Sequence, residues 1–266
     1  MAYKTINGIQ IYYDVSGNDT GETILFLHGL GSSSKDWLYQ LPAFEASYQT
    51  LVMDMRGHGQ SDKPTVHSYK MTEFASDVIA LLNQLAIDKV HVVGLSMGGM
   101  ITFQLAVDYP ERIQSMTIIN SGPAVVVRSF KDRSTVWMRF LIVRLLGMKK
   151  MGETLAPRLF VDDEHEELRQ MFIKNWAEND PKAYMAAMRA IVGWSVESQI
   201  DSISIPSLTL ASDQDYTPIS AKESYVAKMP NAQLKIIDNA HHAAPVERPE
   251  IVNAFITEFI KQHTMI

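Results

Sequence analysis

Residues 89–100 read Lys-Val-His-Val-Val-Gly-Leu-Ser-Met-Gly-Gly-Met, and this stretch decides the fold. A continuous apolar run, typical of a buried strand, leads directly into a Gly-x-Ser-x-Gly turn and then into a helical pattern. Such a sharp strand-to-helix turn exposes the serine hydroxyl at the edge of a sheet. The positions two before and two after the serine pack against each other, so Gly94 and Gly98 fit where larger residues would not. The stretch therefore predicts that Ser96 is a nucleophile.

Short apolar runs on both sides of this stretch predict further strands that are buried on both faces, as in a parallel sheet covered by helices. The predicted strands are residues 23–27, 50–53, 90–93, 116–119, 206–211 and 233–237. Helical patterns cover residues 71–85, 97–109 and 251–260. A hairpin is expected at the start, where Asn7-Gly8 suits a type I′ turn between residues 5–6 and 9–13.

The alternation of strands and helices breaks after Gly122-Pro123. Residues 129–199 have a helical pattern with no clear strand, and strand character returns at Pro206. The sequence therefore predicts an α/β sheet that is interrupted by a helical insertion of about 75 residues, as the helical periodicity indicates.

Composition excludes several classes of function. The chain has 266 residues, no cysteine and a net charge of −6, so disulfides, thiolate chemistry and an electrostatic footprint for nucleic acid are not expected. No uncharged apolar stretch reaches the roughly 18 residues of a membrane span, and the first residues lack a signal-peptide pattern. We expect a cytoplasmic protein with a small-molecule partner and no nucleic-acid or membrane partner. The oligomeric state is left open.

A serine hydroxyl needs a base, and the chain order Ser, then Asp, then His is the one that this turn motif predicts. His241 and His242 follow the last predicted strand, so either could be the base. Asp213 and Asp215 follow the strand before it, and either could hold the imidazole in the correct tautomer. The other aspartate is expected to shape the turn or to cap the next helix.

A tetrahedral intermediate also needs two hydrogen-bond donors for its oxyanion. The backbone N–H of Met97, directly after Ser96, is one candidate. The glycine-rich turn in residues 25–31 (Leu-Phe-Leu-His-Gly-Leu-Gly) offers the N–H of Leu30 as the second. His28, in the same turn, is expected to be a hydrogen-bonded structural residue.

Together these features resemble the α/β-hydrolase superfamily over nearly the whole chain. The segment at residues 54–62 (Asp-Met-Arg-Gly-His-Gly-Gln-Ser-Asp) looks like a structural turn of that family. The resemblance implies an eight-stranded, mostly parallel sheet with helices on both faces and a helical cap inserted after the sixth strand. We accordingly expect a core of residues 1–122 and 201–266 and a cap of residues 123–200.

The resemblance also favours one member of each ambiguous pair. Counted from Pro206, the acid position of the family falls on Asp215, although the loop that follows is one residue short and Asp213 stays an alternative. The family histidine is commonly followed five residues later by Glu-x-Pro, which selects His242 through Glu247. The implied catalytic set is Ser96, His242 and Asp215, with Leu30 and Met97 as oxyanion donors and with no metal or cofactor.

Differences between this sequence and other members of the superfamily narrow the range of expected functions. A serine nucleophile argues against relatives that resemble haloalkane dehalogenases or epoxide hydrolases, and Ala243 stands where carbon–carbon bond hydrolases usually carry tryptophan. The elbow also differs from that of proline iminopeptidases. The resemblance implies hydrolysis of a small carboxylic ester or lactone through an acyl-enzyme. The alternatives are a carbon–carbon bond hydrolase, a cofactor-free perhydrolase or lyase, an acyltransferase, and a non-enzymatic ligand receptor.

The predicted insertion is rich in apolar side chains, some of which are expected to roof the substrate pocket while most pack the cap. They are Trp137, Met138, Phe140, Leu141, Leu145, Leu146, Phe160, Phe172, Trp176, Met185, Met188 and Trp194. Arginines of the same segment could anchor a substrate carboxylate, and the sequence does not select among them. They are Arg128, Arg133, Arg139, Arg144, Arg158 and Arg189.

Overall fold

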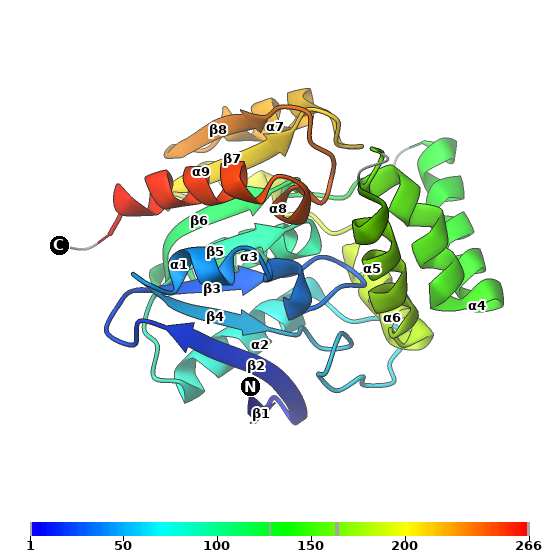
Figure 1. Cartoon of the computed structure of the whole chain (residues 1–266), viewed down its shortest axis with the longest axis horizontal. Helices are drawn as coiled ribbons and strands as arrows, with labels where there is room; N and C mark the ends of the chain where they lie inside the picture. Colours follow the sequence, from blue (N-terminus) through cyan, green and yellow to red (C-terminus); the bar gives the residue numbers. More distant parts are fainter. Residues whose placement is uncertain (1, 128, 163–164, 265–266) are drawn as a thin grey trace.

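A single sheet of eight strands forms the centre of the molecule, as seen in a computed structural model that describes residues 2–127, 129–162 and 165–264 (Figure 1). The spatial order of the strands is β1-β2-β4-β3-β5-β6-β7-β8. The strands are β1 Ala2–Ile6, β2 Ile9–Gly17, β3 Thr23–Leu27, β4 Gln49–Met53, β5 Val90–Leu95, β6 Ile113–Ile119, β7 Ser207–Ser212 and β8 Ala232–Ile237. β2 pairs antiparallel with β1 and β4, and all other pairs are parallel. The predicted fold class is confirmed.

The hairpin that begins the sheet has the predicted turn. Asn7 and Gly8 have φ values of 48° and 83°, and a type I′ turn needs two such residues in succession. Ile6 therefore pairs with Ile9, and β1 and β2 continue in register to the pair Ala2–Tyr13.

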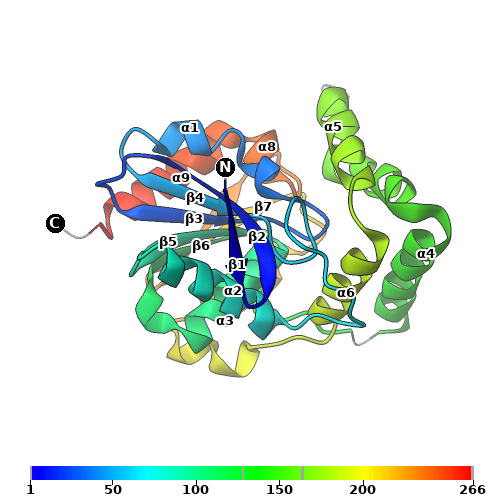
Figure 2. The ribbon, with the colours of Figure 1, turned by 90° about the horizontal axis from the view of Figure 1, so that it is seen from below.

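Helices cover both faces of the sheet, as Figure 2 shows. On one face lie α2 (Met71–Gln84), α3 (Met97–Asp108) and α7 (Ile219–Val226), and on the other α1 (Leu41–Phe44) and α9 (Pro249–Lys261). Shorter helical segments complete the layers. They are η1 Ser34–Trp37, η2 Pro110–Arg112, η4 Glu197–Ser202 and α8 Ala244–Glu247.

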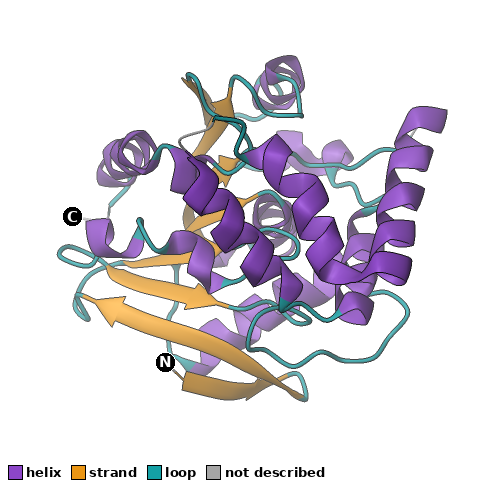
Figure 3. Ribbon diagram, turned by 45° about the vertical axis from the view of Figure 1, so that its right-hand side comes forward, coloured by secondary structure: helices purple, strands orange, loops and turns teal. Residues whose placement is uncertain are grey.

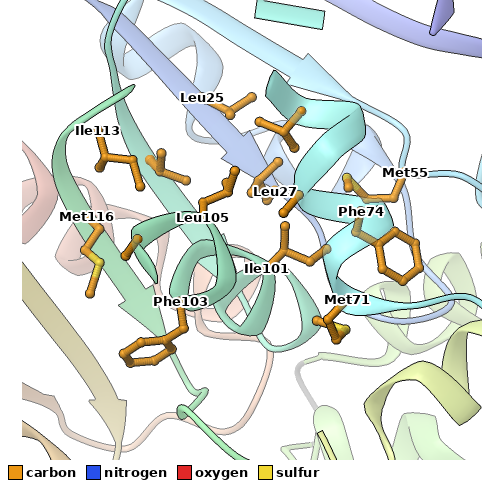
Figure 4. Close-up of a cluster of buried hydrophobic side chains, with 14 of the residues drawn as sticks. Leu25, Leu27, Met55, Met71, Phe74, Ile101, Phe103, Leu105, Ile113 and Met116 are labelled. Atoms are coloured by element: carbon orange, nitrogen blue, oxygen red, sulfur yellow. The ribbon is translucent and has the colours of Figure 1, made fainter. Parts of the chain in front are cut away.

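Each face of the sheet has its own hydrophobic core. Leu25 and Leu27 of β3 pack with Phe74 of α2 and Ile101 of α3 on one side (Figure 4). Phe26, between those two leucines, points to the opposite face. Since alternate residues of β3 serve opposite cores, all five of its residues are buried, which explains its continuous apolar sequence.

Between β6 and β7 the described residues form three α-helices beyond the carboxyl ends of the parallel strands (Figures 1 and 3). They are α4 Phe130–Leu159, α5 Glu166–Ala177 and α6 Pro181–Ile191. α4 is interrupted at Gly147, whose φ of 80° and ψ of −179° are not helical. None of the described helices is long and apolar enough to cross a bilayer.

The two ends of this insertion lie side by side. Ala124 forms an isolated antiparallel bridge with Ser195, and the N–H of Val125 donates to the carbonyl of Trp194 at 2.9 Å. The chain therefore leaves the sheet and returns to it at nearly the same place. The division into a core and a cap of residues 123–200 stays a prediction, with which this pairing agrees.

Candidate active site

Ser96 occupies a strained turn between β5 and α3. Its φ of 53° and ψ of −113° lie outside the regions that L-residues favour. The N–H of Ser96 donates to the carbonyl of Ile119 at 3.0 Å, and the hydroxyl of Ser121 donates to the carbonyl of Ser96 at 2.6 Å. Backbone strain of this kind persists only where the surroundings enforce it. Here the last residue of β6 holds the N–H of Ser96, and Ser121, two residues beyond the strand, holds its carbonyl.

The neighbouring glycines are sterically required. A Cβ atom on Gly94 would lie 2.5 Å from the backbone of Gly98, and a Cβ on Gly98 would lie 2.0 Å from the carbonyl oxygen of Leu27. Both obstacles are backbone atoms, which cannot turn aside as a side chain can. The spacing of the motif thus reflects direct contact between α3, β5 and β3.

Gly98→Ala is expected to lower the free energy of unfolding by about 3 kcal/mol or more, because overpacking against fixed backbone is costly. Gly122→Ala is the matched control, since its Cβ would lie at an ordinary 3.7 Å from the ring of Tyr225. Urea unfolding monitored by circular dichroism measures both variants. Equal stability of the two would contradict this account of the elbow.

His242 and Asp215 come together at the carboxyl ends of β8 and β7. Nδ1 of His242 lies 2.8 Å from Oδ1 of Asp215, whose side chain is fully buried. The other carboxylate oxygen accepts from Nζ of Lys222 at 2.7 Å and from the hydroxyl of Thr217. Burial alone would raise the pKa of Asp215, but the hydrogen bond and charge of His242, with the bonds from Lys222 and Thr217, lower it to about 2. The carboxylate is therefore ionised at neutral pH.

The other members of the two ambiguous pairs have different partners. The side chain of Asp213 accepts a hydrogen bond from the N–H of Ala240 at 3.1 Å. Nδ1 of His241 bonds to the buried carboxylate of Glu247 at 2.7 Å. Asp213 and His241 thus hold the loop after β8 in shape. His242 and Asp215 bond to each other instead, and their catalytic roles stay a prediction.

A tyrosine hydroxyl stands between the predicted base and the predicted nucleophile. The hydroxyl of Tyr216 lies 2.7 Å from Nε2 of His242, and the two rings stack with centroids 4.2 Å apart. Across the described part of the chain, no direct hydrogen bond joins Ser96 to His242. Tyr216 is 59% exposed overall, but its hydroxyl end is enclosed, and this burial together with the charge of Asp215 raises its pKa. The phenol therefore stays protonated at neutral pH.

The two expected oxyanion donors have no competing acceptor. Met97 opens α3, where the first N–H groups of a helix lack an intrahelical partner, and Leu30 lies in the turn after β3. Within residues 2–127, 129–162 and 165–264, neither N–H donates a hydrogen bond. Both groups are free to bind an oxyanion, and their role in doing so stays a prediction.

His28, in the same turn, is a structural residue. Its Nε2 accepts from the N–H of Met55 at 3.0 Å, and its Nδ1 lies 2.8 Å from the carbonyl of Gly29. Full burial lowers the pKa of His28 to about 4 against the opposing effect of the Gly29 bond. A neutral imidazole with both nitrogens engaged joins the Leu30 turn to the segment after β4.

Sequence reasoning missed two residues that hold the site together. Asn120 is buried at the end of β6, and its Nδ2 donates to the hydroxyl of Ser212 at 2.8 Å and to the carbonyl of His242 at 3.0 Å. Lys222 is buried in α7 beside Asp215. The position of Asn120 directly after a buried strand was the available signal, whereas nothing in the sequence distinguishes Lys222 from a surface lysine.

A cavity of about 530 Å³ opens above Ser96 and His242. The insertion supplies most of its apolar wall, and four of the predicted apolar residues take part. They are Phe160, Phe172, Trp176 and Met188. Four others are exposed instead of lining this cavity. They are Trp137, Met138, Leu145 and Leu146.

One group of described side chains has a spacing compatible with a metal ion. The potential ligand atoms of Asp162, His165 and Glu247 lie within 4.8 Å of one another. The carboxylate of Glu247, however, already accepts from the N–H and Nδ1 of His241 at 2.6 and 2.7 Å. A cation would have to compete with both bonds, and the expectation that no metal is required stays a prediction.

The model of the α/β-hydrolase fold family matches residues 22–249, which span the elbow, the insertion and both loops that carry Asp215 and His242. The chain belongs to the α/β-hydrolase fold family. It is a hydrolase.

Individual α/β-hydrolases are similar over nearly their full length. 3-Oxoadipate enol-lactonase 2 of Acinetobacter baylyi is 27% identical over 263 residues, with 97% of this chain and 96% of the relative covered. The crystal structure of the enol-lactonase from Burkholderia xenovorans LB400 superposes with a TM-score of 0.91 at 22% identity and covers 98% of this chain and all of that one. A thermophilic esterase from Thermogutta terrifontis gives a TM-score of 0.89 at 24% identity, with 99% of each chain covered. The two structures support the fold of this hydrolase.

Proposed function

We propose that this α/β-hydrolase cleaves a small carboxylic ester or lactone with Ser96 as nucleophile, His242 as base and Asp215 as the acid that orients the base. The observation that carries the proposal is the 2.8 Å bond between His242 and an ionised, fully buried Asp215, next to a serine held at a φ of 53°. The names of the relatives, enol-lactonase and esterase, support the same bond type.

In the proposed reaction, the Ser96 oxygen attacks the ester carbonyl while Nε2 of His242 takes the hydroxyl proton. The N–H groups of Leu30 and Met97 stabilise the oxyanion. His242 then gives its proton to the leaving alkoxide, which departs as the alcohol, or stays attached when the substrate is a lactone. Water, deprotonated by His242, attacks the acyl-enzyme and releases the acid and Ser96. Asp215 accepts the Nδ1–H bond throughout and stabilises the imidazolium.

The hydroxyl of Tyr216 must leave Nε2 before this reaction can begin. Nε2 has one lone pair, so it cannot accept from the phenol and take the Ser96 proton at the same time. The phenol also occupies the space beside Nε2 that the leaving oxygen and the hydrolytic water need. In this mechanism the substrate displaces a hydrogen bond that the free enzyme makes within itself.

Tyr216→Phe is therefore expected to raise kcat/KM for simple esters by up to about tenfold, which corresponds to the net 0.5–1.5 kcal/mol of one hydrogen bond. Tyr39→Phe, an exposed tyrosine that does not line the cavity, is the control. Initial rates with p-nitrophenyl butyrate measure the effect. A fall of more than tenfold would instead make the phenol a participant in proton transfer.

The test of the proposed function uses p-nitrophenyl acetate, butyrate and octanoate together with a small γ-lactone. Turnover with saturation kinetics and stoichiometric labelling of Ser96 by a fluorophosphonate, located by peptide mass spectrometry, are the expected results. The absence of turnover on every ester and lactone, together with an unlabelled Ser96, would overturn the proposal. Addition of an alcohol to the assay distinguishes hydrolysis from acyl transfer, because a transferase would form the new ester.

A further inference from the structure

Arg139 is the arginine that the structure selects from the candidates in the insertion. It lies in the part of α4 before Gly147, is partly buried, and lines the cavity that contains Ser96 and His242. Arg128 lies outside the described residues. The remaining arginines do not line this cavity and are exposed or otherwise engaged. They are Arg133, Arg144, Arg158 and Arg189.

No carboxylate pairs with Arg139 in the part of the chain that the structure describes. Its charge acts on two tyrosine hydroxyls, those of Tyr184 and Tyr216. Burial raises the pKa of Tyr184 to about 12, and the positive charge of Arg139 acts against that rise at both tyrosines. A neutral phenol does not cancel the charge of a guanidinium. The five N–H donors of the guanidinium lie in one plane and match the geometry of a carboxylate.

The other charged residues that line the cavity either have a partner of their own or lie at the start of α4. Lys35 pairs with Glu178 at 3.3 Å, and Asp36 accepts from the hydroxyl of Ser32. Lys131 and Asp132 belong to the first turn of α4, two helical turns before Arg139. Arg139 is thus the cavity-lining cation whose charge acts on Tyr216, the tyrosine beside His242.

We propose that Arg139 binds a carboxylate of the substrate, so that the ester or lactone cleaved at Ser96 is an anion with a free carboxylate group. The inference rests on the proposed function of the Ser96 site. Tyr216 lies near both the Ser96 site and Arg139. Its hydroxyl is 2.7 Å from Nε2 of His242, and the charge of Arg139 acts against the rise in its pKa that burial causes. A small dicarboxylic monoester can therefore place its carbonyl at Ser96 and its carboxylate at the guanidinium.

The test compares the mono-p-nitrophenyl esters of glutaric, adipic and pimelic acids with the same esters capped as neutral methyl esters. Wild type is expected to prefer one of the anionic esters over its neutral partner. Arg139→Met is expected to lower this preference, the ratio of the two kcat/KM values, by about 10- to 100-fold, as for a lost charge-assisted hydrogen bond. Arg139→Lys should restore part of it, and Arg133→Met, an exposed arginine of the same helix, should leave it unchanged.

Calorimetric binding of glutarate and adipate gives a second readout that does not need turnover. Wild type is expected to bind at least one of them at the site of Ser96, with an affinity that Arg139→Met weakens by a similar factor. Equal ratios in wild type and Arg139→Met, or dicarboxylate binding that ignores the substitution, would overturn the inference while neutral-ester hydrolysis still supported the proposed function. Loss of hydrolysis on all esters would overturn the proposed function, and the binding data would then still decide the role of Arg139.

Discussion

Ser96→Ala is expected to lower kcat for p-nitrophenyl butyrate by about 10⁶-fold, as for the loss of a serine nucleophile from a working triad. The alanine has no oxygen to attack the carbonyl, so no acyl-enzyme can form. The residue keeps its strained backbone conformation, which Ile119 and Ser121 enforce through hydrogen bonds to its N–H and carbonyl. Circular dichroism should therefore show an unchanged fold, and steady-state kinetics with high enzyme concentration measure the residual rate.

Ser134→Ala provides the control for this experiment. Its side chain is exposed on α4, donates to the carbonyl of Lys131 and does not line the cavity. Full activity is expected. Retention of more than a tenth of the activity in Ser96→Ala would place the nucleophile elsewhere and remove the basis of the proposed mechanism.

Asp215→Asn is expected to lower kcat by about 10⁴-fold, because an amide favours the wrong tautomer of the His242 imidazole, the proposed base, and does not stabilise its charged form. The substitution also removes the carboxylate that pairs with the buried Lys222, so thermal unfolding must be measured beside kcat. An asparagine is nearly the same size as the aspartate, which keeps steric effects small.

Asp213→Asn is the matched control, two residues earlier in the same loop. Its Oδ1 accepts from the N–H of Ala240, and the carbonyl oxygen of an asparagine can accept the same bond. A change in kcat of less than about fivefold is expected, within the range of neutral surface substitutions. The opposite result, a large loss in Asp213→Asn and a small one in Asp215→Asn, would reverse the assignment of the acid.

The strands and the elbow could be predicted because local rules dictate them. A strand buried on both faces must be apolar at every position, as β3 is, and the turn at Ser96 admits only glycine where Gly94 and Gly98 meet backbone atoms. These constraints act within a few residues or between sequence-adjacent elements. They leave a readable pattern without knowledge of the rest of the molecule.

Choices between neighbouring residues needed the three-dimensional structure. His241 and His242 are adjacent in the sequence, yet one bonds to Glu247 and the other to Asp215. The path of the loop after β8 determines which ring enters the site, and no periodicity describes a loop. The family resemblance favoured His242 through the spacing to Glu247, and the structure gives that spacing a physical meaning, since Glu247 bonds to the neighbouring ring.

The insertion was the least predictable part for a related reason. A helix with apolar residues on two sides, such as α4, does not reveal which side faces the cavity. Trp137 and Met138 are exposed, whereas Arg139, the next residue, lines the cavity. The sequence does not predict the hydrogen bond between Tyr216 and His242, because this bond depends on how two separate loops meet.

Among the described strands, β8 lies at the edge of the sheet and has β7 as its single neighbour, and most of its residues are partly exposed. Edge elements with few buried contacts open more readily than the rest of a fold. The proposed base, five residues beyond the end of β8, therefore depends on one of the least protected strands. Local opening of β8 would separate His242 from Asp215 while the two hydrophobic cores stayed folded. The working lifetime of the catalyst would then be set by local opening at this edge and not by global unfolding.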